Sequence, residues 1–179
     1  MDFVKILIRI IFIFLILVLT GIITEFIYNL SSHVFNAFRY YTLYGGGERC
    51  LNKLDQYTDD FVSLGTFEKG NCRIKNAVRI SSFKNTELSG DLTLSCPTAL
   101  EVGQYFSDIK AEYVEHIGTY NCRTISRSKI MSEHSYGTAI DISEIDGASI
   151  KNDWNKNTKK GAILSNAHKV ACSYFSNVL

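Results

Sequence analysis

His134 and Asp141 are the two residues whose types and spacing could bind a metal ion in this chain. They lie seven positions apart in the stretch MSEHSYGTAIDIS, residues 131–143. A neutral imidazole and a carboxylate are good zinc ligands, and a catalytic zinc usually has three protein ligands and one water. A surface histidine followed by a solvated aspartate at a strand edge is nevertheless the more common arrangement. The spacing therefore leaves two alternatives, a metal site or an ordinary strand.

Asp141 belongs to a predicted strand with the sequence TAIDIS. Its neighbours Ala139, Ile140 and Ile142 are apolar, and a carboxylate buried among such residues without a partner would be costly. A metal ion or an arginine beside Asp141 would remove that cost. His134 lies in the preceding loop, followed by Gly137.

Further elements must position these residues, and their order predicts an α+β fold with a small antiparallel sheet and packed helices. We expect short strands at AVRISSF, before Pro97, at VEHIGTY and at TAIDIS, and we expect a turn at Asp146-Gly147. Pro97 suits the first turn of a helix reaching about Tyr113. Apolar residues at helical spacing predict a last helix in GAILSNAHKVACSYFSNVL. The stretch VSLGTFEKGNC is expected to be a turn-rich lead into the first strand, and KNDWN a loop.

Composition and charge narrow the class of protein. Hydrophobic residues make up 46% and charged residues 21% of the 179 positions, which is ordinary for a globular chain. The net charge is +1, and no segment clusters enough Lys and Arg for a nucleic-acid footprint. We therefore expect no nucleic-acid partner.

The first thirty residues predict a membrane anchor. Between Arg9 and Glu25 the run IIFIFLILVLTGIIT carries no charge, and with its apolar flanks it is long enough to cross ~30 Å of hydrocarbon. Lys5 and Arg9 precede the run, so the positive-inside rule puts the rest of the chain across the membrane. The run is long for a signal peptide and no A-x-A-like site follows it, which favours an uncleaved anchor over a cleaved signal. We expect an anchor over 1–30, a juxtamembrane linker over 31–49 and a domain over 50–179.

Five cysteines follow the predicted anchor, and none forms a C-x-x-C pair, so a zinc ribbon has no support. In an exported domain such wide spacing suits disulfides. We expect Cys50 to pair with Cys72, because they frame one small unit, and Cys122 with Cys172. That pairing leaves Cys96 as the unpaired thiol.

The stretch SEHSYGTAIDI resembles the SEHxxxxAxDI motif of the bacterial extensin-like C-terminal domain family. Other landmarks of that family occur in the same order, so the resemblance covers roughly residues 50–179. These landmarks are Cys50-Leu51, Gly70-Asn71-Cys72, Cys96-Pro97, the run TYNCR at 119–123, Asp146-Gly147, Asp153-Trp154 and Ala171-Cys172.

The motif is also similar to S-x-H-x-x-G-x-A-x-D of the D-alanyl-D-alanine carboxypeptidase and sonic hedgehog-like zinc fold. This resemblance implies that His134 and Asp141 are zinc ligands. It implies that Arg123 contacts substrate or an oxyanion; the alternative is a salt bridge to Asp141 or Glu133. Ser132 either orients His134 through a hydrogen bond or closes the loop.

In the resembling family the third ligand lies in an H-x-D-H-x-H segment after the last helix, and this sequence ends at Leu179. We therefore expect a C-terminally truncated domain with an incomplete zinc site. The tail of the family also carries a further cysteine, which would account for the odd count.

The resemblance implies a zinc metallopeptidase-like domain on the periplasmic side of a bacterial inner membrane. It would be held to lipid by a single-pass helix and directed at peptidoglycan. The alternatives are a non-catalytic wall-binding module, a structural membrane protein, or a gene remnant.

Overall fold

We analysed a computed structural model of the chain, which describes residues 47–179. The predicted anchor and most of the predicted linker lie outside the described residues. Within the described range, no helix combines the length and the apolar character needed to cross a bilayer. The main helices and strands, in chain order, are α2 (Gly47–Leu54), β1 (Phe61–Lys69), β2 (Cys72–Phe83), β3 (Thr86–Ser95), α3 (Cys96–Ile109), β4 (Tyr113–Gly118), β5 (Asp141–Ile145), β6 (Ala148–Ser149), α4 (Ile150–Asp153) and α5 (Lys159–Tyr174).

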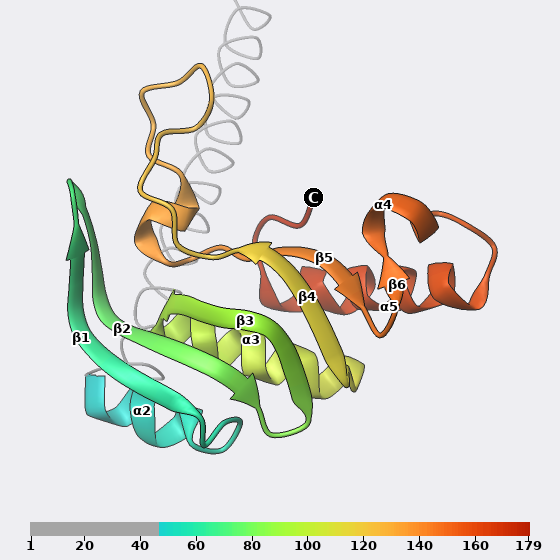
Figure 1. Ribbon diagram of the computed structural model, residues 1–179, viewed down its shortest axis with the longest axis horizontal. Helices are drawn as coiled ribbons and strands as arrows, with labels where there is room; N and C mark the ends of the chain where they lie inside the picture. Colours follow the sequence, from blue (N-terminus) through green and yellow to red (C-terminus); the bar gives the residue numbers. More distant parts are fainter. Residues whose placement is uncertain (1–46) are drawn as a thin grey trace, which may run out of the picture. The chain divides into compact units, whose positions relative to one another are not determined.

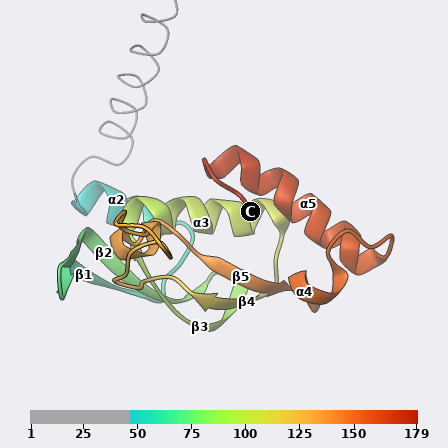
Figure 2. The ribbon, with the colours of Figure 1, turned by 90° about the horizontal axis from the view of Figure 1, so that it is seen from above.

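The strands form one six-stranded sheet in the order β1-β2-β3-β4-β5-β6 (Figure 1). Neighbouring strands are antiparallel except β3 and β4, which are parallel because α3 connects them. Figure 2 shows α3 and α5 side by side over one face of this sheet. The predicted α+β class with a largely antiparallel sheet and packed helices is confirmed.

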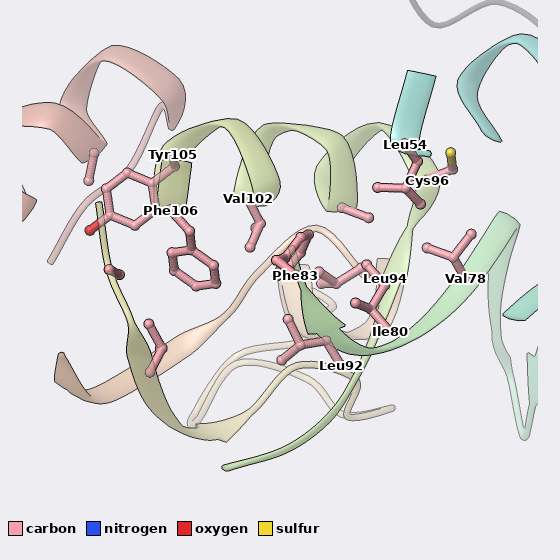
Figure 3. Packing of buried hydrophobic residues seen from close by; sticks show 14 of the residues in the cluster. Leu54, Val78, Ile80, Phe83, Leu92, Leu94, Cys96, Val102, Tyr105 and Phe106 are labelled. Atoms are coloured by element: carbon pink, nitrogen blue, oxygen red, sulfur yellow. The ribbon is translucent and has the colours of Figure 1, made fainter. Parts of the chain in front are cut away.

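The core lies between α3 and the central strands. On β2 the buried positions include Val78 and Ile80, and on β3 they include Leu92 and Leu94, so alternate residues of each strand face the helices. Figure 3 shows Phe106 pointing from α3 toward the strands. Its ring meets that of Phe83 edge-on, with centroids 5.5 Å apart. This packing holds together the sheet whose strand β5 begins at Asp141.

The start of α3 agrees with the sequence prediction. Pro97 lies in the first turn, and the Ser95 hydroxyl accepts a hydrogen bond from the backbone N–H of Thr98. The helix ends earlier than predicted, at Ile109, because Lys110 adopts the left-handed conformation with φ 55° and its N–H bonds the carbonyls of Phe106 and Ser107.

Three local predictions were wrong. The segment predicted as a turn-rich lead is β1, an edge strand whose pairing with β2 is interrupted on both sides of Gly65. KNDWN is not entirely loop, because α4 runs through Asp153. Helix α2 begins at Gly47, so the last residues assigned to the linker are helical.

The disulfide pairing differs from the prediction. Cys50 bonds Cys96, and Cys72 bonds Cys122, so neither Cys50–Cys72 nor Cys122–Cys172 forms. Cys96 is fully buried and bonded, and the free thiol is the exposed Cys172. The reason is three-dimensional: α2 packs against α3, which brings Cys50 to the first residue of α3 rather than to the start of β2.

The raised pKa values of Tyr174 and Tyr105 lead us to expect that the domain loses stability at alkaline pH. The hydrogen bond that the Tyr174 hydroxyl donates to the Asp108 carboxylate, together with burial, raises the pKa of Tyr174 to about 12. Burial raises the pKa of Tyr105 to about 12. Unfolded tyrosine has a pKa near 10, so between about pH 10 and 12 the unfolded chain releases protons that the folded chain retains, and stability falls as pH rises.

We expect urea unfolding to show this fall, and we expect a shallower fall for Tyr174→Phe. Equal pH dependence in the wild type and in Tyr174→Phe would contradict the assignment.

Candidate functional site

A short 3₁₀ helix, η1 (Glu133–Tyr136), presents His134. It ends at Gly137, which has φ 66° and donates its N–H to the carbonyls of Glu133 and His134. The Gly137 carbonyl in turn accepts from Ser95 N at 2.9 Å. A Cβ on Gly137 would lie 2.8 Å from both Ile74 Cδ1 and Ser95 N. Only glycine therefore allows η1 to lie this close to β2 and β3.

Asp141 is the first residue of β5, where it pairs with Gly118 of β4. Its neighbours Ile140 and Ile142 pack against the core. Because successive strand residues point to opposite faces, the Asp141 side chain points away from the core, and 56% of it is exposed. The Asp141 carboxylate is therefore not buried, and the energetic cost of burying it without a partner, which its apolar neighbours suggested, does not arise. No arginine beside Asp141 is needed.

The structure brings His134 and Asp141 together. His134 Nε2 lies 3.3 Å from Asp141 Oδ2, and the His134 side chain is only 12% exposed. The other ring nitrogen, Nδ1, lies 2.5 Å from the backbone carbonyl of Thr119. A carbonyl can only accept, so Nδ1 carries the proton and the Nε2 of a neutral ring offers a lone pair toward the carboxylate. Two acceptors that face each other at this distance can share a cation between them, and a proton and a metal ion both meet that description.

Thr119 is a functional residue that sequence reasoning missed. It is buried, and its side-chain Oγ1 accepts a hydrogen bond of 2.9 Å from Thr93 N of β3. This bond fixes the carbonyl that orients the His134 ring. A backbone acceptor for Nδ1 is a common way to set the tautomer of a metal-ligating histidine. No side-chain pattern could have revealed it, because the group that acts is a carbonyl.

Ser135 was also missed, although it lies inside the motif. It is fully buried. Its hydroxyl can donate a hydrogen bond to Asn121 O at 3.0 Å or to Arg123 O at 2.9 Å. The same hydroxyl oxygen accepts a hydrogen bond from Arg123 N at 3.1 Å. These bonds join η1 to the segment that carries Arg123. The only signal in the sequence was a hydroxyl beside the histidine.

Of the two roles considered for Ser132, orienting His134 or closing the loop, the hydrogen bonds fit the closing of the loop. Its N–H donates to Arg123 O, and its carbonyl accepts from Ser135 N, so it closes the loop. Thr119 O is the acceptor for the His134 ring.

Arg123 is exposed. Neither Asp141 nor Glu133 pairs with its guanidinium, so the salt bridge considered from the sequence does not form among the described residues. The carboxylate of Glu133 instead accepts from Thr138 Oγ1.

Among the described residues, His134 and Asp141 form a pair that belongs to no larger cluster of similar side chains. In the part of the chain that the structure describes, no group of three or more His, Cys, Asp or Glu side chains lies close enough to share a metal ion. The described residues contribute one imidazole and one carboxylate that face each other, the Thr119 carbonyl that holds the His134 ring, and a guanidinium without an ion pair.

Comparison with known proteins gives one match. Residues 48–179 match a family model described as "Extensin-like protein C-terminus". No curated protein and no solved structure matches the chain.

Proposed function

Because this chain belongs to the extensin-like C-terminal family, we propose that it is an exported, membrane-anchored domain related to zinc-dependent peptidoglycan peptidases. His134 and Asp141 would be its metal-binding side chains. One observation carries this proposal: His134 Nε2 and Asp141 Oδ2 face each other at 3.3 Å while Nδ1 is held by Thr119 O.

The spacing of the two side chains fits zinc. Two ligands about 2.0–2.1 Å from a tetrahedral zinc lie about 3.3 Å from each other, which is the separation found here. A charge-assisted hydrogen bond between an imidazolium and a carboxylate is normally shorter, about 2.7–2.9 Å. The donor set, one imidazole and one carboxylate, also suits zinc.

Each residue has a defined part in this proposal. Thr119 O holds the His134 ring so that Nε2 faces the metal position, and Asp141 supplies a negative charge from the exposed side, where a substrate can approach. The free guanidinium of Arg123 binds a carboxylate or a developing oxyanion of the substrate. Zinc, when bound, lowers the pKa of its water and polarises a peptide carbonyl.

A second function is a non-catalytic module that binds the cell wall. It is favoured by the ligand count, since a hydrolytic zinc normally has three protein ligands and the described residues bring two together. The two functions share the fold and the Arg123 surface, and differ in whether a bond is cut.

The decisive experiment measures zinc binding by the full chain in detergent, by calorimetry. We expect one zinc per chain. Loss of an outer-shell partner alone costs about 10–100-fold in metal affinity, so His134→Ala should weaken binding by at least about 100-fold. His168→Ala, which changes a histidine of α5 instead, is the matched control and should bind as the wild type does.

Incubation with muropeptides then separates the two functions. Zinc-dependent cleavage that is lost in His134→Ala supports the peptidase, and binding without cleavage supports the wall-binding module. No stoichiometric zinc binding, or equal binding by His134→Ala, would overturn the metal site.

A further inference from the structure

The chain between β4 and β5 contains a hairpin, residues 124–131, which is separate from the His134–Asp141 pair. Figure 1 shows it extending away from the sheet, beyond η1. Thr124 pairs with Met131, and Ile125 N donates to Ile130 O at 2.8 Å. The tip is held by Ser128, whose N–H donates to Ile125 O and whose hydroxyl accepts from Ile130 N. The hairpin is therefore an ordered projection with a defined register.

The hairpin carries two adjacent exposed isoleucines. Ile125 and Ile130 lie directly opposite each other in the antiparallel register, and opposed residues point to the same face. They are 47% and 68% exposed. Isolated surface apolar residues are normal, so the isoleucine pair gains meaning only together with the charges beside it.

Positively charged residues flank this apolar pair in the sequence. Arg127 and Lys129 occupy the tip and Arg123 its base, all three exposed. None of them forms an ion pair with another described residue. No acidic residue occurs between His116 and Ser132. A chain with a net charge of +1 thus carries three exposed cations, without an ion pair to another described residue, within the seven positions 123–129.

We propose that hairpin 124–131 docks on an anionic lipid bilayer. Ile125 and Ile130 enter the boundary between headgroups and acyl chains, and Arg127 and Lys129 contact lipid phosphates. A few apolar side chains ringed by cations are what an interfacial anchor needs, and anionic lipid attracts such cations near its surface. A glycan strand or an acidic peptide could satisfy the cations, but it offers no apolar layer for the isoleucine pair. The proposal depends on the hairpin alone and not on the metal site.

A fluorescent probe on the hairpin tests the proposal in the full chain. Ser126→Cys in a Cys172→Ser background places one environment-sensitive label beside Ile125, and the chain is reconstituted in vesicles. We expect the emission to shift to the blue, with quenching by nitroxide lipids, in phosphatidylcholine mixed with phosphatidylglycerol. We expect no shift in phosphatidylcholine alone. The same label at Asn157→Cys, in the exposed loop between α4 and α5, is the matched control and should respond to neither.

Two variants test the chemistry of docking. Each cation near an anionic surface contributes about fivefold to binding, so Arg127→Gln with Lys129→Gln should lower the ratio of docked to undocked hairpin about 30-fold. Ile125→Ser with Ile130→Ser should abolish the blue shift. Both pairs are exposed, and thermal melting checks that the fold is unchanged.

The proposal is overturned by an unshifted label in both lipids, by equal shifts at Ser126→Cys and Asn157→Cys, or by equal shifts in anionic and neutral vesicles. It is also overturned if peptidoglycan fragments or an acidic protein shift the label while vesicles do not.

Discussion

Replacing Cys50 and Cys96 together with alanine is expected to lower the free energy of unfolding by about 4 kcal/mol. The bond joins residues 46 positions apart, and the chain-entropy model gives about 4 kcal/mol for closing a loop of that size in the unfolded state. Both cysteines are completely buried, so the substitution also removes packed sulfur atoms from the contact between α2 and α3. Denaturant unfolding under non-reducing conditions measures the loss.

Cys172→Ala is the matched control for this prediction. Cys172 is exposed and unbonded, so its replacement should change the free energy of unfolding by less than about 0.5 kcal/mol. If the double variant unfolded at the same denaturant midpoint as the wild type, the bond would contribute nothing to stability and the prediction would be wrong.

Gly137→Ala is expected to disrupt both the fold and the proposed metal site. The left-handed conformation at φ 66° costs an alanine about 1–2 kcal/mol. Its Cβ would also lie 2.8 Å from Ser95 N and 3.2 Å from Leu94 C, which are backbone atoms that cannot turn aside. Overpacking of this kind adds about 1–3 kcal/mol. Because η1 must move away from β3, the His134 ring leaves Thr119 O, and zinc binding should be lost together with about 2–5 kcal/mol of stability.

Gly147→Ala separates the two contributions. Gly147 also has a left-handed φ, of 77°, but nothing lies within 4 Å of the position its Cβ would take. It should lose only the conformational part, about 1–2 kcal/mol, and should bind zinc as the wild type does. Equal losses in the two variants would falsify the claim that close packing of η1 positions His134.

Local rules predicted the elements whose own residues decide their structure. The strand expected at AVRISSF and the helix start expected at Pro97 depend on neighbouring residues, and both are found, in β2 and in α3. β1 was missed because Gly65 interrupts its apolar pattern at the irregular pairing with β2, so its strand structure depends on the partner strand. The pairing of Cys50 with Cys96 depends on how α2 packs against α3, and the spacing of cysteines along the chain carries no information about that packing.

The candidate site divides in the same way. The proximity of His134 and Asp141 could be anticipated only from the resemblance of their motif to S-x-H-x-x-G-x-A-x-D, in which the corresponding residues bind one zinc ion. The acceptor of the His134 ring and the bonds of Ser135 could not, because backbone carbonyls of residues 119–123 supply them. The sequence specifies which side chain stands at each position, but the acceptors in this part of the site are backbone carbonyls, which every residue has.

The order of the disulfides constrains how the domain can mature. Among the four bonded cysteines, the first pairs with the third and the second with the fourth, so the two bridged loops interleave. A chain that enters an oxidising compartment from its N-terminus exposes Cys50 and Cys72 before either partner arrives. Shorter loops close at a lower entropic cost, so Cys50–Cys72 is the bond expected first, and it is non-native. In such a compartment we therefore expect maturation to include thiol–disulfide exchange, in which Cys96 or Cys122 attacks the early bond and releases one of its two thiols, and an isomerase should speed this step.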